Sequence, residues 1–200
     1  MYRANSELQI EAGYFDTKNG AEGLNERFKY YQDMILINGS SVIDYNIYQI
    51  DSNDSISIRY TFDFGKYGFD QRKEIDRRNQ FENPFENYIY SIDDFLETDR
   101  FLYFNFAYQR YTRNLLYSKV TGQSCIQSLA LELSKNGDEL IFFPAQAIYS
   151  DRLIAIVEAY VFNKELERMS PENIKKWGLD KLPKIDDEDN PVLIFYKTKL

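Results

Sequence analysis

The side chains that most often carry catalysis or bind transition metals are scarce in this sequence. Its 200 residues include no histidine and a single cysteine, Cys125. Histidine general bases, Ser-His-Asp and Cys-His nucleophile systems and histidine-ligated metals are therefore excluded. One cysteine forms neither an internal disulfide nor a cysteine-based zinc site. Because Cys125 stands in an apolar stretch beside Ile126, we expect it to be a small buried residue. We expect no catalytic constellation, no metal site and no organic cofactor.

Two acidic motifs match ion-binding patterns only in part. Asp63-Phe64-Gly65 has the letters of the kinase magnesium motif, but no His-Arg-Asp loop or kinase-type glycine-rich loop accompanies it. We interpret it as the end of a strand followed by a glycine turn. The acidic run 186–190 could hold a hard cation through oxygen ligands, but it lacks the ligand spacing and central glycine of a calcium loop. A solvated turn before Pro191 is the favoured interpretation.

A basic cluster is the strongest candidate for binding an anion. It consists of four cations with two acids interleaved, namely Arg72, Lys73, Arg77 and Arg78 with Glu74 and Asp76. Because opposite charges at this spacing pair locally, a solvated helix face is favoured, and contact with an anion or an acidic glycan is the alternative. The net charge of −8 argues against a broad phosphate-binding surface, so we expect no nucleic-acid partner. Catalytic carboxylate pairs cannot be assigned, because the sequence does not show which acids face one another.

Short strands are the elements that must position these side chains. The clearest is Ile56–Phe64, in which every second residue is apolar without a break and which Gly65 ends. Period-two alternation assigns the two faces directly. The residues expected to pack inward are Ile58, Tyr60 and Phe62, and those expected to be less buried are Arg59 and Thr61.

Similar strand-like segments recur in three groups along the chain. The expected strands are 28–37, 43–48 and 56–64; then 88–96, 101–107, 110–118 and 123–131; then 140–143, 147–149, 152–159 and 192–197. Turn signals separate them at Asn38-Gly39, 51–54, Thr121-Gly122 and Ser150-Asp151. The first group lacks one strand, which Leu8–Phe15 is expected to supply. The chain is therefore predicted to be all-β with minor helical insertions, and such spacing is typical of propeller repeats, although a β-sandwich stays open.

Two insertions interrupt the strands, at 66–87 and 160–190. In the second, Phe162, Leu166 and Met169 have helical spacing. Ser170 before Pro171 is a helix start signal, with serine as N-cap and proline at the first helical position. Gly178 is a plausible C-terminal stop.

Several segments also resemble a known group of proteins. The segments are Asp44–Ile50 with Arg59–Lys66, then Phe142–Pro144 with Asp151–Ala155, and Asp189–Lys197. In these the chain resembles the C-terminal half of the six-bladed, NHL-like β-propeller proteins of Bacteroidetes, many of which are predicted lipoproteins of unknown function. The resemblance covers about residues 25–200. It implies a partial propeller of about three blades of four-stranded antiparallel sheets, forming a single domain over 1–200 with blades at 8–64, 88–131 and 140–200.

The resemblance also implies a location in the cell envelope, as a periplasmic protein or an outer-membrane lipoprotein. The chain itself shows no export signal at its N-terminus, and no apolar run long enough to span a bilayer. A half ring would leave strand edges and an apolar flank uncovered, so we expect self-association through these open edges.

One face of such a domain is expected to carry the function. In a four-stranded blade the second and fourth strands end on the same side, so the two insertions and the links 38–41 and 108–110 should share one face. Long loops on a rigid scaffold are where binding residues concentrate. The candidate binding residues are Arg72, Arg77, Arg78, Tyr108, Arg110 and Trp177. The sequence predicts a non-enzymatic binding or scaffolding domain with a protein or glycan partner. A carboxylate-dependent enzyme acting on glycans or peptides, or a fragment without independent function, are the alternatives.

Overall fold

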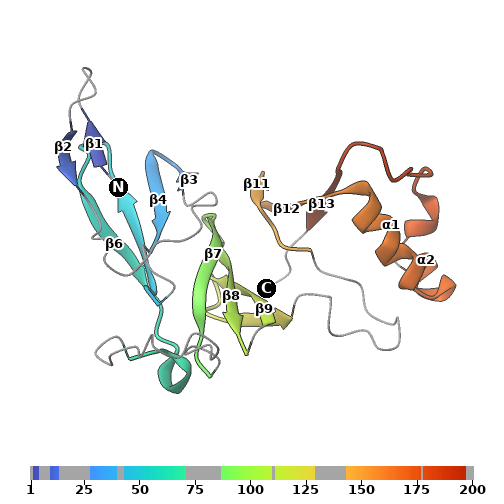
Figure 1. Ribbon diagram of the computed structural model, residues 1–200, viewed down its shortest axis with the longest axis horizontal. Helices are drawn as coiled ribbons and strands as arrows, with labels where there is room; N and C mark the ends of the chain where they lie inside the picture. The colour runs from blue at the N-terminus through green and yellow to red at the C-terminus, as the bar shows by residue number, and fades with distance from the viewer. Residues whose placement is uncertain are drawn as a thin grey trace, which may run out of the picture. The chain divides into compact units, whose positions relative to one another are not determined.

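The computed structural model shows a mostly β chain with few helices (Figure 1). It describes residues 2–4, 10–13, 28–39, 43–70, 87–109, 111–128, 143–176 and 178–196. The chain divides into two compact units, Met1–Asp93 and Asp94–Leu200.

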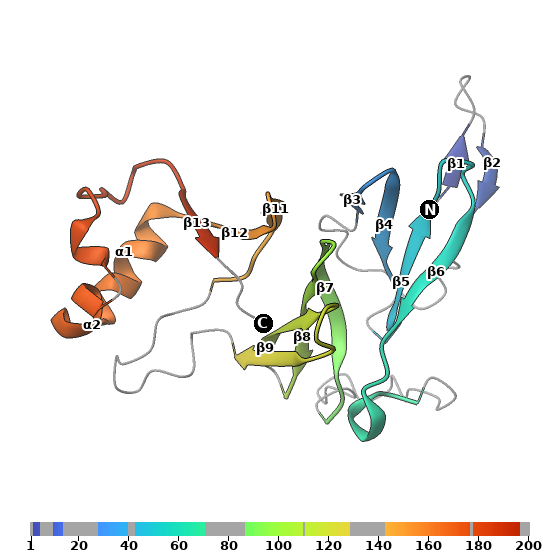
Figure 2. The same cartoon turned by 180° about the vertical axis from the view of Figure 1, so that it is seen from behind.

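The first unit contains a two-stranded and a four-stranded antiparallel sheet (Figure 2). The strands are β1 (Tyr2–Ala4) and β2 (Ile10–Gly13), and then β3 (Phe28–Tyr31), β4 (Met34–Asn38), β5 (Asn46–Ile50) and β6 (Ile56–Thr61), in the order β3-β4-β5-β6. The segment predicted as one strand over 28–37 is a hairpin, because the chain reverses at Gln32, whose φ is 52°. Asn or Gly usually marks such a turn, and neither is present. The prediction that Leu8–Phe15 completes this sheet is wrong, because β2 pairs with β1.

The predicted alternation of strand β6 breaks at a β-bulge. Ile47 of β5 pairs with Tyr60, but the next residue, Tyr48, pairs with Ile58, so Arg59 is the extra residue. Neighbours along β5 face opposite sides and paired residues share a side. Ile58 is therefore on the opposite face from Tyr60 and is 56% exposed, so the prediction that it packs inward is wrong.

The side chains around the bulge follow from this shift. Tyr60 and Phe62 are half-buried and Thr61 is exposed, as predicted. Arg59 is also half-buried, because its guanidinium donates to Gln49 Oε1 at 2.7 Å and lies 5.4 Å from the centre of the Tyr60 ring. The bulge thus holds a cation against the sheet, whereas the sequence predicted that Arg59 would be less buried than its apolar neighbours.

The four-stranded sheet that the sequence predicted over 88–131 is present. Its strands are β7 (Tyr90–Glu97), β8 (Phe101–Tyr108), β9 (Tyr111–Ser118) and β10 (Ser124–Ser128), in the order β10-β9-β8-β7. Phe101–Phe106 is buried throughout, as expected for a central strand covered on both faces. Cys125 is exposed rather than buried. Cys125 lies on β10, the edge strand of the sheet, and pairs with Leu116 of β9. The prediction of a buried cysteine is therefore wrong.

The last sheet of the second unit has three strands, and its connection contains the helices. The order is β11 (Ala147–Tyr149), β12 (Arg152–Val157), β13 (Val192–Tyr196), with α1 (Ala159–Arg168) and α2 (Pro171–Lys176) between β12 and β13. Ser170 Oγ accepts the backbone N–H of Asn173 at 3.3 Å, which confirms the predicted start of α2. Gly178 has a φ of 70° and leads into a 3₁₀ helix, Leu179–Lys181. The predicted interruption of this sheet by helices is confirmed.

Two apolar clusters hold the second unit together. The first joins its two sheets and contains Leu96, Phe101 and Tyr103 with Ala145 and Leu153. The second packs α1 on the three-stranded sheet through Ala155, Val157 and Phe162. Consequently the side chains of α1 are positioned against β13, where the pocket described next lies.

Candidate functional site

The residues that the sequence predicted as a binding face are only partly visible. Arg72, Arg77, Arg78, Arg110 and Trp177 lie outside the described residues. Tyr108 is half-buried at the end of β8, where it pairs with Tyr111 across the turn at Gln109. The role of these six residues therefore stays a prediction.

The two acidic motifs have the structural roles expected from the sequence. Asp63 Oδ1 accepts the backbone N–H of Gly65, whose φ is 55°, at 2.8 Å, which ends the strand in a glycine turn. In the run 186–190, Asp189 Oδ2 accepts the backbone N–H of Asp186 at 2.8 Å, and all five residues are exposed. Among the described residues no cluster of three or more acids or cysteines is placed to hold a metal ion.

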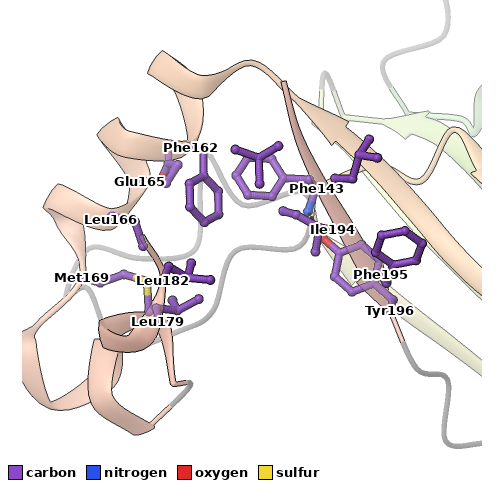
Figure 3. Close-up of a pocket in the computed structure, with 12 residues that line it drawn as sticks. Phe143, Phe162, Glu165, Leu166, Met169, Leu179, Leu182, Ile194, Phe195 and Tyr196 are labelled. Atoms are coloured by element: carbon purple, nitrogen blue, oxygen red, sulfur yellow. Dashed lines mark hydrogen bonds between the residues drawn. The ribbon is translucent and has the colours of Figure 1, made fainter. Parts of the chain in front are cut away.

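A concave site lies between α1 and β13 in the second unit (Figure 3). Its cavity volume is about 250 Å³. Twelve residues line it, eleven of them apolar or aromatic: Phe143, Phe162, Glu165, Leu166, Met169, Leu179, Leu182, Val192, Leu193, Ile194, Phe195 and Tyr196. An apolar pocket with one polar group has the usual composition of a small-molecule site.

Helical periodicity explains one wall of the pocket. Phe162, Glu165, Leu166 and Met169 recur at i, i+3, i+4 and i+7, which places them on one face of α1 and its C-terminal end. Figure 3 shows them on one side of the site, with Ile194 and the rest of β13 on the other. Helical spacing in the sequence predicted the apolar members of this stripe but not Glu165. A glutamate on a helix is ordinarily solvated, and only its position within the stripe could have revealed it.

The remaining wall comes from β13 and the turn after α2. Leu179 and Leu182 lie beside Met169 (Figure 3), positioned by the left-handed backbone of Gly178 that precedes them. Leu182 is 43% exposed, and Leu193 and Phe195 are 54% and 48% exposed. Leu182 is therefore the exposed apolar side chain at the rim of the pocket, whereas Leu193 and Phe195 alternate with Ile194 along β13 and face the other side of the sheet.

Glu165 is the one ionisable carboxyl among the lining residues. It is buried, with 8% exposure. Its Oε1 accepts a hydrogen bond from Arg168 Nη1 at 3.1 Å, one turn along α1. Its Oε2 is also buried, and it accepts no hydrogen bond from the described residues. Buried polar atoms normally have partners, so Oε2 marks an unmet acceptor at the pocket wall.

Tyr196, at the end of β13, links two lining segments of the pocket by a hydrogen bond to Phe143, which precedes β11. Its hydroxyl oxygen accepts the backbone N–H of Phe143 at 2.9 Å. Burial raises the pKa of Tyr196 to about 12, against the opposing effect of this hydrogen bond. The tyrosine is therefore a neutral, structural member of the site at ordinary pH.

A second buried polar group lies between the two sheets of the second unit. The hydroxyl of Tyr103 lies 2.8 Å from Asn105 Oδ1 and 3.0 Å from Asn114 Oδ1, and it accepts the backbone N–H of Ala145 at 2.9 Å. Asn105 in turn donates to Asp94 Oδ2 at 2.7 Å. Burial raises the pKa of Tyr103 well above its ordinary range. Because these side chains link three strands of one sheet, and the Tyr103 hydroxyl also binds the chain just before β11, we assign the network to architecture rather than to ligand binding.

In the first unit Tyr45 binds the backbone of two segments, one that contains Phe69 and one that contains Ile89. The hydroxyl of Tyr45 donates to Ile89 O at 2.5 Å and accepts the backbone N–H of Phe69 at 2.7 Å. Burial raises the pKa of Tyr45. Nearby, Asp44 Oδ2 accepts the hydroxyl of Tyr48 at 3.1 Å, and burial followed by this negative charge raises the pKa of Tyr48. The two hydrogen bonds of Tyr45 anchor the segments before and after residues 71–86.

The fold and the pocket thus define a class: a chain of repeated antiparallel sheets with a ligand-sized apolar site beside an inserted helix. The chain belongs to the family described as "Domain of unknown function (DUF4934)", whose model matches residues 3–197. No curated protein matches the sequence. Within the described residues, no helix is long and apolar enough to cross a membrane.

One solved structure is similar in fold. It is the crystal structure of a Bacteroides fragilis protein that is provisionally named an exported protein, with a TM-score of 0.66 and 17% sequence identity. The match covers 98% of this chain and 57% of that chain. The chain thus spans little more than half the length of that protein, and the likeness concerns the fold.

Proposed function

We propose that this chain is a non-enzymatic ligand-binding domain of an exported bacterial protein, and that the pocket between α1 and β13 takes a small apolar group. The observation that carries the proposal is the pocket itself, with its volume of about 250 Å³ and a lining that is apolar apart from Glu165. A concave site lined mainly by apolar side chains with few polar groups is typical of small-molecule binding sites.

The size of the cavity supports a specific ligand size. A dry cavity of about 150 Å³ lined by leucine, isoleucine and phenylalanine binds benzene. A cavity of about 250 Å³ has room for one aromatic ring with a short side arm. Transfer of apolar surface from water into such a site is favourable by about 25 cal/mol per Å², so an apolar body supplies most of the affinity.

The proposal includes the wider architecture and location. Three sheets of three or four antiparallel strands, together with the motifs that resemble Bacteroidetes propellers, support a partial β-propeller of about three blades. The name of the Bacteroides fragilis protein that shares the fold supports a place in the cell envelope. A protein or glycan partner bound at the predicted loop face remains part of the proposal.

An enzyme acting through two carboxylates is less well supported by this site. Glycosidase-type catalysis needs two acids facing each other about 5–10 Å apart. The pocket lining contains one acid, Glu165. The pocket therefore favours binding over hydrolysis.

Methyl NMR of the full chain titrated with ethylbenzene tests the proposal. We expect the methyl signals of Leu166, Leu182 and Ile194 to shift in a saturable way. Val120, which is 72% exposed in a turn of the same unit, is the control and should not shift. Shifts of the pocket methyls no larger than that of Val120 would contradict the proposal.

A matched pair of variants locates the binding. Leu182→Asp places a charge at the open side of the pocket and should abolish the ethylbenzene shifts. Ile126→Asp introduces the same charge at a residue that is 57% exposed on the edge strand β10 and should leave them unchanged. Loss of the shifts in both variants, or in neither, would contradict the assignment of the site.

A further inference from the structure

We infer that the ligand of this pocket is a small apolar amine, whose ammonium group donates a hydrogen bond to Glu165 Oε2. The inference rests on the proposed function, since it specifies what the apolar pocket binds. It assigns an arylalkylamine-type ligand, consisting of one ring or branched aliphatic group with a short arm that ends in a primary amine.

The first step is the state of the carboxyl group. An ionised carboxylate offers about four lone-pair positions. Arg168 donates to Oε1, and Oε2 is buried without a partner among the described residues. An unmet buried acceptor is unfavourable, because it has lost its hydrogen bonds to water without replacement. A bound donor would restore that interaction, so this atom favours a ligand with a donor group.

The second step is the choice between a charged and a neutral donor. Hydrogen bonds between a cationic donor and a carboxylate are roughly twice as strong as those between neutral groups. Arg168 contributes one contact to Glu165 through a side chain that is 61% exposed, so solvent screens much of its positive charge. Because Glu165 lines the cavity, an ammonium group on the ligand complements its carboxylate best.

The third step is the shape of the ligand. Glu165 lies on α1 between Phe162 and Leu166, so the polar atom is at the wall of the cavity and the apolar residues surround the remaining space (Figure 3). A ligand that contacts both the carboxyl group and the apolar lining must carry its amine at one end of an apolar body. The terminal torsion of a glutamate is soft, so rotation of the carboxyl group lets Oε2 turn toward a donor in the cavity.

The experiment compares phenethylamine with its neutral counterpart ethylbenzene on the full chain at pH 7, by the same methyl NMR titration. We expect phenethylamine to bind about tenfold more tightly or better, which is the effect of one hydrogen bond to a charged group. This comparison needs no variant, so it stands even where a substitution impairs folding.

Two variants then assign the preference to one residue. Glu165→Gln should remove the preference for the amine while ethylbenzene still binds. Glu167→Gln, which removes an exposed acid two residues away on the same helix, is the matched control and should keep the preference.

The outcomes separate the inference from the proposed function. Equal affinity for the two probes, or an amine preference that survives Glu165→Gln, overturns the inference and leaves the apolar pocket intact as a binding site. Failure of both probes to bind overturns the proposed function and the inference together.

Discussion

At the scale of single residues, most of the buried polar side chains described in the second unit have hydrogen-bond or ionic partners. Glu97 is fully buried as a side chain, and the ammonium group of Lys119 lies 2.5 Å from its Oε1 and 2.7 Å from Thr98 O. The two polar atoms left buried without partners among the described residues are Asn114 Nδ2 and Glu165 Oε2. Asn114 belongs to the network of Tyr103, whereas Glu165 lines a cavity. This difference is why we place the ligand at Glu165.

We predict that Lys119→Met destabilises the chain. Removing the cation that pairs with the fully buried Glu97 leaves that charge uncompensated, so the free energy of unfolding should fall by about 3 kcal/mol. Urea unfolding of the full chain measures the change. Lys184→Met is the control, because the ion pair of Lys184 with Asp186 is exposed on both sides and should contribute nothing measurable. Equal effects of the two substitutions would contradict the assignment of a buried pair.

We predict that stability falls at high pH through Tyr196. Because burial raises its pKa from 10.0 to about 12, the folded state favours the protonated hydroxyl. The stabilisation is complete below pH 10 and is lost as the pH rises from about 10 to about 12. Urea midpoints measured across this range should fall more steeply for the natural chain than for Tyr196→Phe. Parallel curves would show that Tyr196 is not buried in the neutral form.

At the scale of elements, β-bulges and the position of a strand in its sheet decide how exposed a residue is, which the periodic pattern alone does not predict. Alternation predicted the existence of β6, but the bulge at Arg59 reversed the face of Ile58. A bulge adds one residue without any requirement for a particular amino acid, so the sequence carries no signal for it. Likewise, apolar neighbours suggested a buried Cys125, whereas exposure depends on its place at the edge of the sheet, which is a property of the tertiary structure.

We predict that Cys125 reacts in the native chain. An exposed thiol on an edge strand is accessible to a disulfide reagent such as Ellman's reagent without prior unfolding. The full chain should release one equivalent of thionitrobenzoate within minutes in buffer, at a rate that urea changes little. Reaction that requires denaturant would show that β10 is covered in solution.

At the scale of the whole molecule, the sequence predicted the repetition of sheets better than the site. The second sheet, the turns and the helical interruption could be predicted because each depends on local patterns of alternation, glycine and capping residues. The pocket could not, because its walls come from α1 and β13, which are separated by residues 169–191 and meet only through tertiary packing. The apolar stripe of Phe162, Leu166 and Met169 was visible, but the cavity beside it was not.

We predict that the full chain self-associates at tens of micromolar, a working range for association through exposed surface. The outer face of the three-stranded sheet carries Ile156, Leu193 and Phe195, each about half exposed, and exposed apolar faces favour association. Sedimentation velocity should show species larger than a monomer, which Ile156→Glu should disperse and Val120→Glu should not. A well-behaved monomer in this range would contradict the prediction.

Crystals of the full chain under xenon pressure test the central claim most directly, because xenon enters dry apolar cavities of sufficient size. The anomalous signal should place xenon between α1 and β13, in contact with Phe162, Leu166 and Ile194. Side chains filling this space, or xenon bound only elsewhere in the chain, would contradict the claim that this chain holds an apolar ligand pocket.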